Sequence, residues 1–586
     1  MKAEKKKSTV SRVLNYIGKY KYLVPVSIFM ALIHTALSLY IPILIGEAID
    51  LIVGEGLVDL TGVVSVLLFA GILILVAALA SWIMSVINNK IAFNVTRDIR
   101  NEAFAKIERL PLSYIDTTPH GDTVNRIIND TDRFSEGLLL GFTQVFTGIL
   151  TIVGTLVFMI MINWQVALVV VLLTPLSVFI AKFIGSRTYN MFRARSESEA
   201  NAAAFIDEMV GNQKLVLAFG KEEKAIRDFK RIGDDLEKTS LQAIFFSSLT
   251  NPTTRFVNNM VYAAVALVGA LIILSGDGVA LAFTIGEFSV LLSYTNQYTK
   301  PFNEISGIFA EFQNALASAA RVFDLIEEEA ETPDQESASE ISDASGKVSL
   351  SDVEFSYSED KPLIEDLNLE VSPGMRVAIV GPTGCGKTTL INLLMRFYDV
   401  RSGRIAVDGK DIREITRKSL RASYGMVLQD TWLSEGTVRD NITFGKKDAT
   451  EEEIVAAAKA AHAHSFIKRL KHGYDTKIGE GGEGLSEGQR QLISIARIML
   501  TSPPMLILDE ATSSIDTRTE MRIQKAFSEM MVGRTSFIVA HRLSTVREAD
   551  IILVMRDGRI IETGRHEELL EKGGFYSELY NSQFAH

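Results

Sequence analysis

The sequence predicts a helical membrane domain followed by an α/β domain built around a glycine-rich P-loop. Three long apolar stretches without any Lys or Arg, residues 22–89, 134–181 and 256–299, predict the first part. A β-branched strand at 377–380, which runs into a Gly-rich loop and then into an apolar helical pattern, predicts the second. The 586 residues, 47% of them hydrophobic, are too many for one ordinary domain and too apolar for an ordinary soluble chain.

Composition and charge exclude several classes of protein. The aliphatic richness excludes a disordered chain, and the single cysteine, Cys385, excludes a disulfide scaffold. The net charge of −11 argues against nucleic acid as a partner, because phosphate binding needs a local excess of Lys and Arg. Residues 1–330 carry 28 basic and 31 acidic side chains, whereas residues 331–586 carry 32 and 40, so most of the acidity lies in the second part.

Each apolar stretch is long enough for two crossings of about 20 residues. The stretches break near their middles, at 50–61, 163–164 and 275–278, so we expect six transmembrane helices within residues 22–326. Basic residues gather between the stretches, which predicts that these segments, the N-terminus and the C-terminal domain are cytoplasmic. The first apolar stretch is too long for a signal-peptide core. We therefore expect a multi-pass protein of the cytoplasmic (inner) membrane, preceded by an interfacial elbow over residues 1–21.

The two cytoplasmic segments show helical spacing of apolar residues and read as extensions of the membrane helices. Pro and Gly punctuate bends near 111–121 and 211–220, which are either ordinary turns or contact points for another domain. Residues 327–346 are acidic and Ser-rich, which is typical of a linker. The second domain is then expected over residues 347–586.

The P-loop matches G-x-x-x-x-G-K-[ST] in the strand, loop and helix context that the motif requires. Its glycines let backbone amides close around a phosphate chain, and the helix N-terminus adds partial positive charge. Lys387 can reach the outer phosphates, and the Thr388 hydroxyl can bind Mg²⁺. We expect ATP to be bound by Gly381, Pro382, Thr383, Gly384, Cys385, Gly386, Lys387, Thr388 and Thr389.

A second buried strand before residue 509 ends in two carboxylates, Asp509 and Glu510. Asp509 is placed to hold Mg²⁺ and Glu510 to orient or polarise an attacking water. Alone, the pair would be weak evidence, because a solvated pair at a sheet edge has the same pattern. The P-loop upstream favours the catalytic interpretation.

Between these two motifs, residues 485–489 read Leu-Ser-Glu-Gly-Gln, and here the chain resembles the ATP-binding-cassette (ABC) family, whose signature reads LSGGQ. The resemblance extends in order and spacing to Tyr357 (adenine stacking), Gln429 (Q-loop), Asp516 (D-loop) and His541 (switch histidine). It implies Glu510, His541 and Gln429 as catalytic residues and Thr388, Gln429 and Asp509 as Mg²⁺ ligands. Six helices and one cassette look like a type IV ABC exporter half-transporter of the bacterial multidrug type, in which the two bends would be coupling helices.

In that family, two cassettes sandwich two ATP molecules, each held by one chain's P-loop and the other chain's signature, so this chain must dimerise. Its signature residues Ser486, Glu487, Gly488 and Gln489 depart from the family at Glu487, where a glycine is expected. One interpretation is that Glu487 only stabilises the first turn of its helix. The other is that its charge repels the terminal phosphate of the partner's ATP. The second interpretation favours a heterodimer with a partner of intact signature, with a homodimer as the alternative.

The sequence indicates the substrate less clearly than it indicates the nucleotide site. His34, Glu47 and Glu287 lie in or near predicted spans, where ionisable residues often line a pathway. The alternatives are an interfacial position for the two glutamates and a helix-packing hydrogen bond for His34. We expect export of amphiphilic drugs, with a lipid flippase as the second candidate. A third, of a different class, is an ATP-gated channel or sensor subunit.

Overall fold

The computed structural model describes residues 8–52, 58–274, 284–358, 361–428, 431–509, 516–539 and 546–583. Contacts divide the chain into two units. The N-terminal unit comprises Met1–Arg109 and Thr118–Glu328, and the C-terminal unit comprises Leu110–Thr117 and Glu329–His586. The short segment Leu110–Thr117 is therefore part of the C-terminal unit, although in sequence it lies between the two parts of the N-terminal unit.

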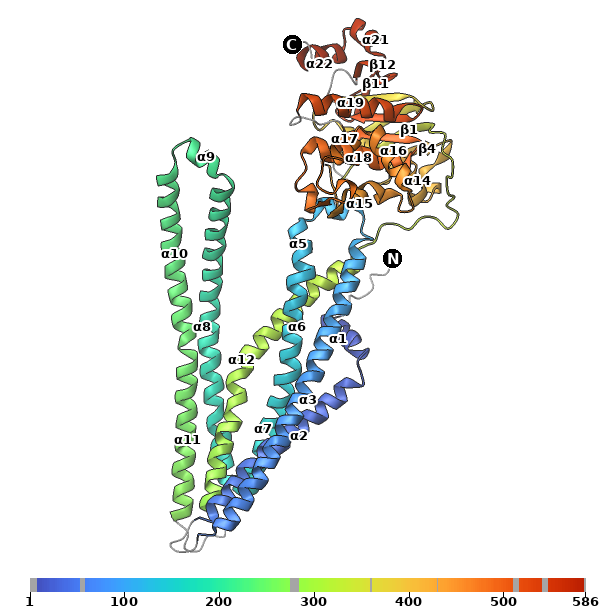
Figure 1. The fold of residues 1–586 in the computed structure, drawn as a ribbon. Coiled ribbons are helices and arrows are strands. Elements are labelled where there is room, and N and C mark those ends of the chain that lie inside the picture. The colour runs from blue at the N-terminus through green and yellow to red at the C-terminus, as the bar shows by residue number, and fades with distance from the viewer. Residues whose placement is uncertain are drawn as a thin grey trace. The chain divides into compact units, whose positions relative to one another are not determined.

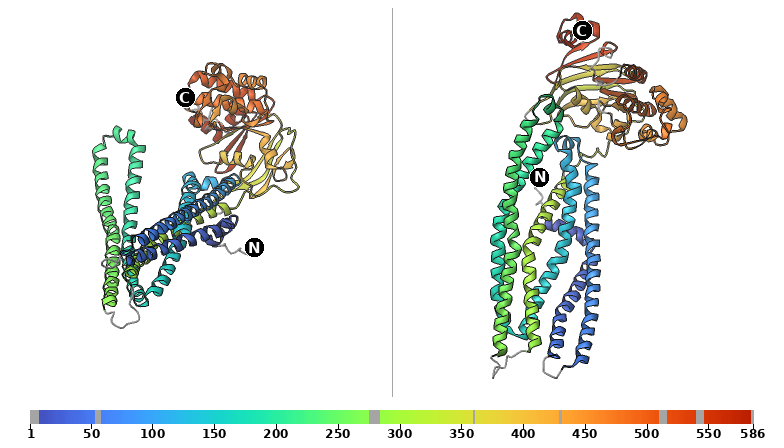
Figure 2. Two further views of the ribbon diagram at one scale, coloured as in Figure 1. Left: turned by 60° about the horizontal axis from the view of Figure 1, so that its bottom comes forward. Right: turned by 60° about the vertical axis from the view of Figure 1, so that its left-hand side comes forward.

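Long helices make up the N-terminal unit (Figure 1). In chain order they are α1 (Thr9–Gly18), α2 (Leu23–Asp50), α3 (Leu60–Ile107), α5 (His120–Asn125), α6 (Thr131–Leu140), α7 (Phe146–Ile162), α8 (Trp164–Gly211), α9 (Gln213–Ala218), α10 (Glu222–Ser248), α11 (Thr250–Leu274) and α12 (Ile285–Glu327). Two π-helical turns, η1 (Arg126–Asp130) and η2 (Gly141–Val145), join α5, α6 and α7 into one continuous stretch. The helices α8 and α10 run side by side, and α9 lies at their tip (Figures 1 and 2).

Four helical stretches among the described residues are long and apolar enough to cross a membrane: Leu23–Asp50, Leu60–Ile107, His120–Ile162 and Glu222–Leu274. A shorter apolar segment, Trp164–Leu176, begins α8. Several large apolar side chains on α3 are exposed, among them Leu68, Leu75 and Trp82. Several buried positions in the same part of α3 instead carry small residues, namely Ala70, Ala77 and Ala80. This division is typical of helices that face lipid on one side and pack closely on the other.

Polar contacts tie α2 to α12. The hydroxyl of Tyr294, fully buried, donates to the carbonyl of Leu39 at 2.6 Å. Near the other end, the Asp50 carboxylate accepts from the backbone N–H of Gly286 at 2.7 Å. Here Gly46 and Gly286 allow the closest approach, since a Cβ on Gly286 would lie 2.1 Å from the Gly46 carbonyl oxygen. The absence of two side chains thus sets the spacing of these helices.

Helix α1 lies against α3 and α12. The Ser8 side chain accepts from the N–H of Ser11 and so caps the helix. The Tyr16 hydroxyl donates to Glu102 at 2.7 Å, and Arg12 pairs with Glu327 at 2.9 Å. The basic, apolar-spaced segment before the first span therefore forms a short helix anchored at both faces.

The C-terminal unit contains two main sheets. The antiparallel sheet has the order β2 (Ile364–Val371), β1 (Val348–Phe355), β4 (Ser402–Val407) and β5 (Lys410–Asp411). The six-stranded sheet has the order β12 (Arg559–Gly564), β11 (Ile551–Arg556), β3 (Arg376–Val380), β10 (Thr535–Val539), β9 (Met505–Asp509) and β6 (Tyr424–Val427). All of its strands except β12 are parallel to their neighbours, and a two-stranded ribbon pairs β7 (Gly436–Thr437) with β8 (Lys477–Ile478).

Helices complete this unit: α4 (Leu112–Thr117), α13 (Lys387–Leu394), α14 (Arg417–Ala422), α15 (Val438–Ile442), α16 (Glu451–Ala460), α17 (His464–Ile467), α18 (Glu487–Thr501), α19 (Thr517–Met531), α21 (His566–Glu571) and α22 (Phe575–Gln583). Alternate residues of β3 enter different cores: Ala378 joins one hydrophobic cluster, while Val377 and Ile379 join the other. A parallel sheet covered on both faces accounts for the continuous apolar strands of the sequence. The predicted order of a helical domain followed by an α/β domain is confirmed.

Acidic residues after Glu329 pack on the C-terminal unit through arginines. Arg417, with a side chain only 9% exposed, contacts Asp334 at 2.8 Å and Glu331 at 3.1 Å. Arg396, 5% exposed, lies 3.5 Å from Asp334 and 2.9 Å from Asp399. We call Glu331, Asp334, Arg396, Asp399 and Arg417 the arginine clamp. The segment predicted as a linker therefore includes carboxylates that are fixed to the fold.

Candidate nucleotide site and membrane cavity

The predicted site residues follow the carboxyl ends of neighbouring strands. The strand order places β3, β10, β9 and β6 side by side, and the register pairs Val539 with both Ile379 and Asp509. In open α/β sheets, ligands bind outside this edge of the strands. Of the residues predicted here, Gln429, Glu510 and His541 lie outside the described residues. They follow β6, β9 and β10 in sequence, so their catalytic roles stay predictions.

The P-loop connects β3 to α13. Gly384 (φ +84°) and Gly386 (φ +104°) adopt the left-handed conformation, which residues with a Cβ rarely adopt. A Cβ on Gly381 would lie 2.2 Å from the carbonyl oxygen of Met555, so a larger residue would push the loop off the sheet. Pro382 and Thr383 are exposed on the outer side of the loop. The glycines thus shape a loop whose backbone amides precede the positive end of α13.

Lys387 and Cys385 lie on the inner side of this loop. The Lys387 ammonium donates to the carbonyls of Gly381 at 2.8 Å and Pro382 at 3.0 Å. The Cys385 side chain is buried, with its sulfur 4.0 Å from the Lys387 nitrogen. Burial raises the pKa of the Cys385 thiol, and the nearby Lys387 charge lowers it in part. The lone cysteine is therefore a protonated thiol at neutral pH, and it packs inside the loop.

Tyr357, which is predicted to stack on adenine, packs against two other aromatic rings. Tyr357 is half exposed, and its ring meets Phe355 at 4.9 Å and Tyr398 at 5.0 Å, both edge to face. The Tyr357 hydroxyl lies 3.2 Å from the Thr389 hydroxyl, which links it to α13. The Tyr398 hydroxyl donates to the carboxylate of Asp116 on α4. Burial, with Asp116 beside it, raises the pKa of Tyr398.

The described residues offer two of the expected Mg²⁺ ligands. Thr388 presents an exposed hydroxyl at the start of α13, and Asp509 ends β9, two strands away from β3. Hydroxyl and carboxylate oxygens suit Mg²⁺, which usually takes its other ligands from phosphates and water. Within the described part of the chain, no group of three or more His, Cys, Asp or Glu surrounds a common point.

The signature segment begins α18. The Ser486 side chain accepts from the N–H of Gln489 at 3.3 Å, and the Gln489 side chain accepts from the N–H of Ser486 at 3.0 Å. Glu487 is the first helical residue, half-buried, and Gly488 is buried. The Glu487 side chain takes no part in the hydrogen bonds of this capping box. A Ser-x-x-Gln pattern in the sequence is the signal that predicts such a box.

At the D-loop, Asp516 likewise caps α19 by accepting from the N–H of Thr519 at 3.0 Å.

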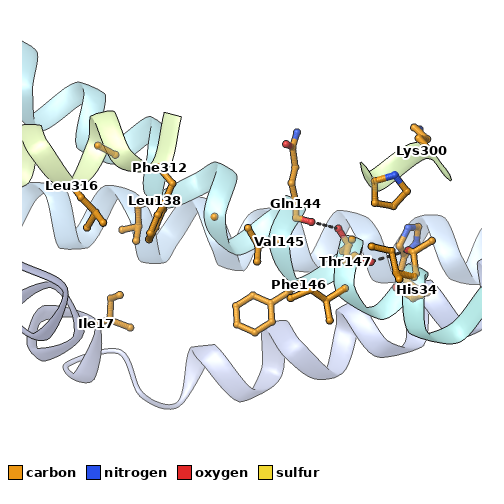
Figure 3. A pocket seen from close by; sticks show the side chains of 18 of the residues that line it. Ile17, His34, Leu138, Gln144, Val145, Phe146, Thr147, Lys300, Phe312 and Leu316 are labelled. Atoms are coloured by element: carbon orange, nitrogen blue, oxygen red, sulfur yellow. Dashed lines mark hydrogen bonds between the residues drawn. The ribbon is translucent and has the colours of Figure 1, made fainter. Parts of the chain in front are cut away.

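The N-terminal unit contains a cavity of about 840 Å³ between α1, α2, the α6–α7 stretch and α12. Its wall is mostly apolar, and His34 lies on it. Figure 3 shows His34 and Lys300 toward one end of the cavity and Ile17 and Leu316 toward the other. The Nδ1–H of His34 donates to the carbonyl of Ala77 at 3.0 Å, so this histidine makes the helix-packing bond that was one of its two interpretations. It leaves Nε2 as the ring nitrogen for a ligand.

The structure does not bring the other two candidate pathway residues to this cavity. Glu47 is exposed on α2, and Glu287 accepts from the N–H of Thr284 at 2.9 Å as part of the capping box of α12. A Thr-x-x-Glu pattern in the sequence indicates that box. The sequence analysis did not single out Lys300, which lines the cavity, or Tyr398, whose ring packs on Tyr357. Lys300 directly follows the third Lys- and Arg-free stretch, which is the signal that could have identified it.

Known proteins match both units of the chain. The profile of the ABC transporter transmembrane region matches residues 24–302, and the ABC transporter profile matches residues 364–513. A fatty acid ABC transporter ATP-binding/permease protein of Mycobacterium bovis is 42% identical over 91% of this chain and 83% of its own length. An ATP-dependent lipid A-core flippase of Desulfotalea psychrophila is 34% identical over 98% of this chain and 100% of its own length.

A solved structure agrees with these sequence matches. The structure of a bacterial Atm1-family ABC exporter with ATP bound superposes with a TM-score of 0.78 at 29% identity, and the match covers 97% of this chain and 99% of that one. The predicted fold class and the ATPase domain coupled to transport are thereby confirmed. The chain belongs to the ABC transporter family and is a multi-pass, type IV-like ABC exporter half-transporter.

Proposed function

We propose that this chain is one half of an ATP-driven exporter that moves amphiphilic small molecules, drugs among them, across the cytoplasmic membrane by alternating access. The observation that carries the proposal is the largely apolar cavity of about 840 Å³ in the N-terminal unit of a chain that also has an ATPase domain. Cavities of this size and polarity suit drug-sized or lipid-like ligands. ATP binding and hydrolysis would then shift the population between inward- and outward-facing states.

The proposal includes the sequence-based domain limits: elbow 1–21, membrane domain 22–326, linker 327–346 and a cytoplasmic nucleotide-binding domain 347–586. Short helices, α4 and α9, lie within the two ranges proposed as coupling helices. The proposed ATP site runs from Gly381 to Thr389 with Tyr357, and Thr388, Gln429 and Asp509 would hold Mg²⁺. Bound Mg²⁺ would neutralise charge on the outer phosphates. Glu510 would polarise the attacking water, aided by Gln429 and His541.

Lipid transport is the second candidate, since two relatives are named as a fatty acid transporter and a lipid A-core flippase. Both candidates need a cavity for an apolar chain, and they differ in the head group. An ATP-gated channel or sensor subunit is less favoured, because a gate needs little turnover and the sequence retains Glu510 and His541. Uptake of a fluorescent amphiphile into inverted vesicles, measured with and without ATP, tests transport directly. A leak that ignores ATP, or no uptake, would contradict export.

We further propose a heterodimer. In a dimer of the family, the P-loop and Glu510 of this chain would meet an intact signature of the partner and form the hydrolysing site. The Glu487-bearing signature would complete a slow site on the partner. The test compares ATPase activity of this chain alone with that of the co-expressed pair. Strong, drug-stimulated activity of the chain alone would overturn the heterodimer, as would an unchanged rate of the pair after Glu510→Gln.

A further inference from the structure

The cavity wall includes two threonines of α7, Thr147 and Thr151, that are one helical turn apart. Their hydroxyls donate to backbone carbonyls four residues earlier, Thr147 to Thr143 at 2.6 Å and Thr151 to Thr147 at 2.8 Å. A hydroxyl has one hydrogen and two lone pairs. Because each hydrogen is already bonded to the helix backbone, these two side chains offer a ligand only acceptors.

His34 of α2 adds a third acceptor to the same cavity. This half-buried side chain donates its Nδ1–H to the carbonyl of Ala77, so Nε2 of the neutral ring carries a lone pair. Among the described residues, none forms a hydrogen bond with Nε2. Figure 3 shows His34 toward the same end of the cavity as Thr147.

Two contacts fix the register between α2 and the η2–α7 stretch. Asn88 links one pair of positions, because the Ser27 hydroxyl donates to it at 2.5 Å and its own amide donates to the Thr143 hydroxyl at 3.2 Å. Leu39 and Gly154 form the other pair, since a Cβ on Gly154 would lie 2.4 Å from Cδ1 of Leu39. Both pairs are about 115 positions apart in sequence, so the two helices run parallel.

This register places His34 level with residues 149 and 150, which lie between Thr147 and Thr151. The three acceptors therefore belong to one level of the cavity. Cβ atoms one helical turn apart are separated by about 5–6 Å, and a hydroxyl donates over about 2.8 Å. Two hydroxyls on neighbouring carbons of a ligand can therefore donate to two of these acceptors at once.

Donors without charge suit this level of the cavity best. An unpaired acceptor in a low-dielectric site gains from a donor, whereas moving a cation there costs far more than moving a hydroxyl. The exposed Lys300 ammonium, which also lines the cavity, would repel a cationic head. Other polar residues of the wall, such as Ser38 and Gln144, can donate or accept and so do not decide between head groups.

We propose that His34, Thr147 and Thr151 form a hydrogen-bond-accepting subsite that binds the neutral polyol head of an amphiphile, a glycerol-type diol, while its alkyl chain lies on the apolar wall. The inference rests on the proposed function and specifies the chemistry of the head group. The same three residues would then select between substrates by the hydrogens that the head donates and not by its charge.

The test uses the full chain in nanodiscs of neutral phosphatidylcholine and two fluorescent C12 probes. One is a 1-O-alkylglycerol with two free hydroxyls, and the other is its dimethyl ether, which accepts hydrogen bonds but cannot donate them. After correction for partition into empty nanodiscs, we expect the diol to bind roughly tenfold more tightly than the ether, as two hydrogen bonds predict. Thr147→Val combined with Thr151→Val should lower that ratio to about threefold, and His34→Phe added to this pair should bring it close to one.

Thr155→Val is the matched control. The Thr155 hydroxyl makes the same kind of bond, to the carbonyl of Thr151 at 2.6 Å, but the residue is fully buried and does not line the cavity. This variant should keep the preference of the wild type. Unchanged affinity for the ether shows that a variant is folded, and the exchanges of threonine for valine keep the side-chain shape, so they test the subsite even if His34→Phe fails to fold.

The outcomes separate the inference from the function on which it rests. Equal binding of diol and ether by the wild type would overturn the subsite, as would a ratio that the two threonine exchanges leave unchanged or that Thr155→Val lowers as far. A third C12 probe with a primary ammonium head tests the charge, and tighter binding of this probe than of the diol would overturn the neutral head. Failure of every probe to bind beyond its partition into empty nanodiscs would instead contradict amphiphile export itself.

Discussion

At the scale of single residues, we expect nucleotide binding to displace the ammonium group of Lys387 from its present partners. That group is held by two neutral carbonyls, those of Gly381 and Pro382. Phosphate oxygens are stronger acceptors for an ammonium, because both partners are then charged. When Lys387 exchanges these carbonyls for phosphate oxygens, the carbonyls are released and the packing around Cys385 should change. The space there is tight, because a Cβ on Gly381 would lie 2.8 Å from the Cys385 sulfur.

Cys385 supplies a chemical probe of this loop. We expect a bulky maleimide to inactivate ATP hydrolysis and bound nucleotide to protect against it, because the thiol lies inside the P-loop. The thiolate is the reacting form. Since burial raises the thiol pKa, the labelling rate should keep rising with pH beyond the ordinary cysteine range. Cys385→Ala is the control and should be insensitive to the reagent; full ATPase activity in completely labelled wild type would contradict the placement.

At the scale of elements, Tyr398 connects Tyr357, the predicted adenine-stacking residue, to α4. Its ring packs on Tyr357, and its hydroxyl donates to Asp116. We expect Tyr398→Phe to retain ATP binding, because the ring stays, and to reduce substrate stimulation of ATPase several-fold, because a bond to a charged group worth about 1.5–3 kcal/mol is lost. The measurement is ATPase rate against drug concentration.

Asp116→Asn is the matched control for this prediction, since an amide oxygen still accepts from Tyr398. Its stimulation should stay closer to the wild type than that of Tyr398→Phe. If Tyr398→Phe were stimulated as strongly as the wild type, the bond to α4 would have no part in coupling. Lost ATP binding would show instead that Tyr398 positions the adenine site.

The arginine clamp supports a stability prediction. Asp334→Ala removes a carboxylate from two nearly buried arginines, Arg396 and Arg417. Breaking a buried pair costs about 3–5 kcal/mol, but Asp334 is 29% exposed and Asp399 and Glu331 remain, so we expect about 1–2 kcal/mol. The apparent unfolding midpoint of the purified protein should fall by about 2–6 °C. Asp343→Ala, exposed in the same segment, should leave it unchanged; equal midpoints for both variants would contradict the clamp.

At the scale of the whole molecule, features that one short segment encodes could be predicted. The P-loop and the signature helix follow from local patterns, because loop geometry and helix capping depend on neighbours in sequence. The bond between Tyr398 and Asp116 joins residues 282 positions apart, and the arginine clamp joins an acidic segment to Arg396, Asp399 and Arg417 much later in the chain. Composition describes such a segment as a linker, because it records charge and not the partners that the fold supplies.

The substrate site shows the same limit. Ionisable residues in apolar stretches pointed to His34, Glu47 and Glu287, and only His34 lines the cavity. Glu287 lies near a span but takes part in the capping box of α12, which accounts for its position. Lys300 lines the cavity because α12 continues as a helix beyond the apolar stretch. The charge pattern alone would end that stretch at residue 299.

The last prediction concerns the pairing of two chains. Because Ser486 and Gln489 cap α18 by themselves, removal of the Glu487 charge should leave the helix end intact. If this carboxylate repels the partner's ATP, Glu487→Gln should raise the weak ATPase activity of the chain purified alone by at least about tenfold. Glu483→Gln, at an exposed carboxylate four residues earlier, should have no effect. An unchanged rate in Glu487→Gln would mean that Glu487 only stabilises its helix, and the sequence argument for a heterodimer would then fall.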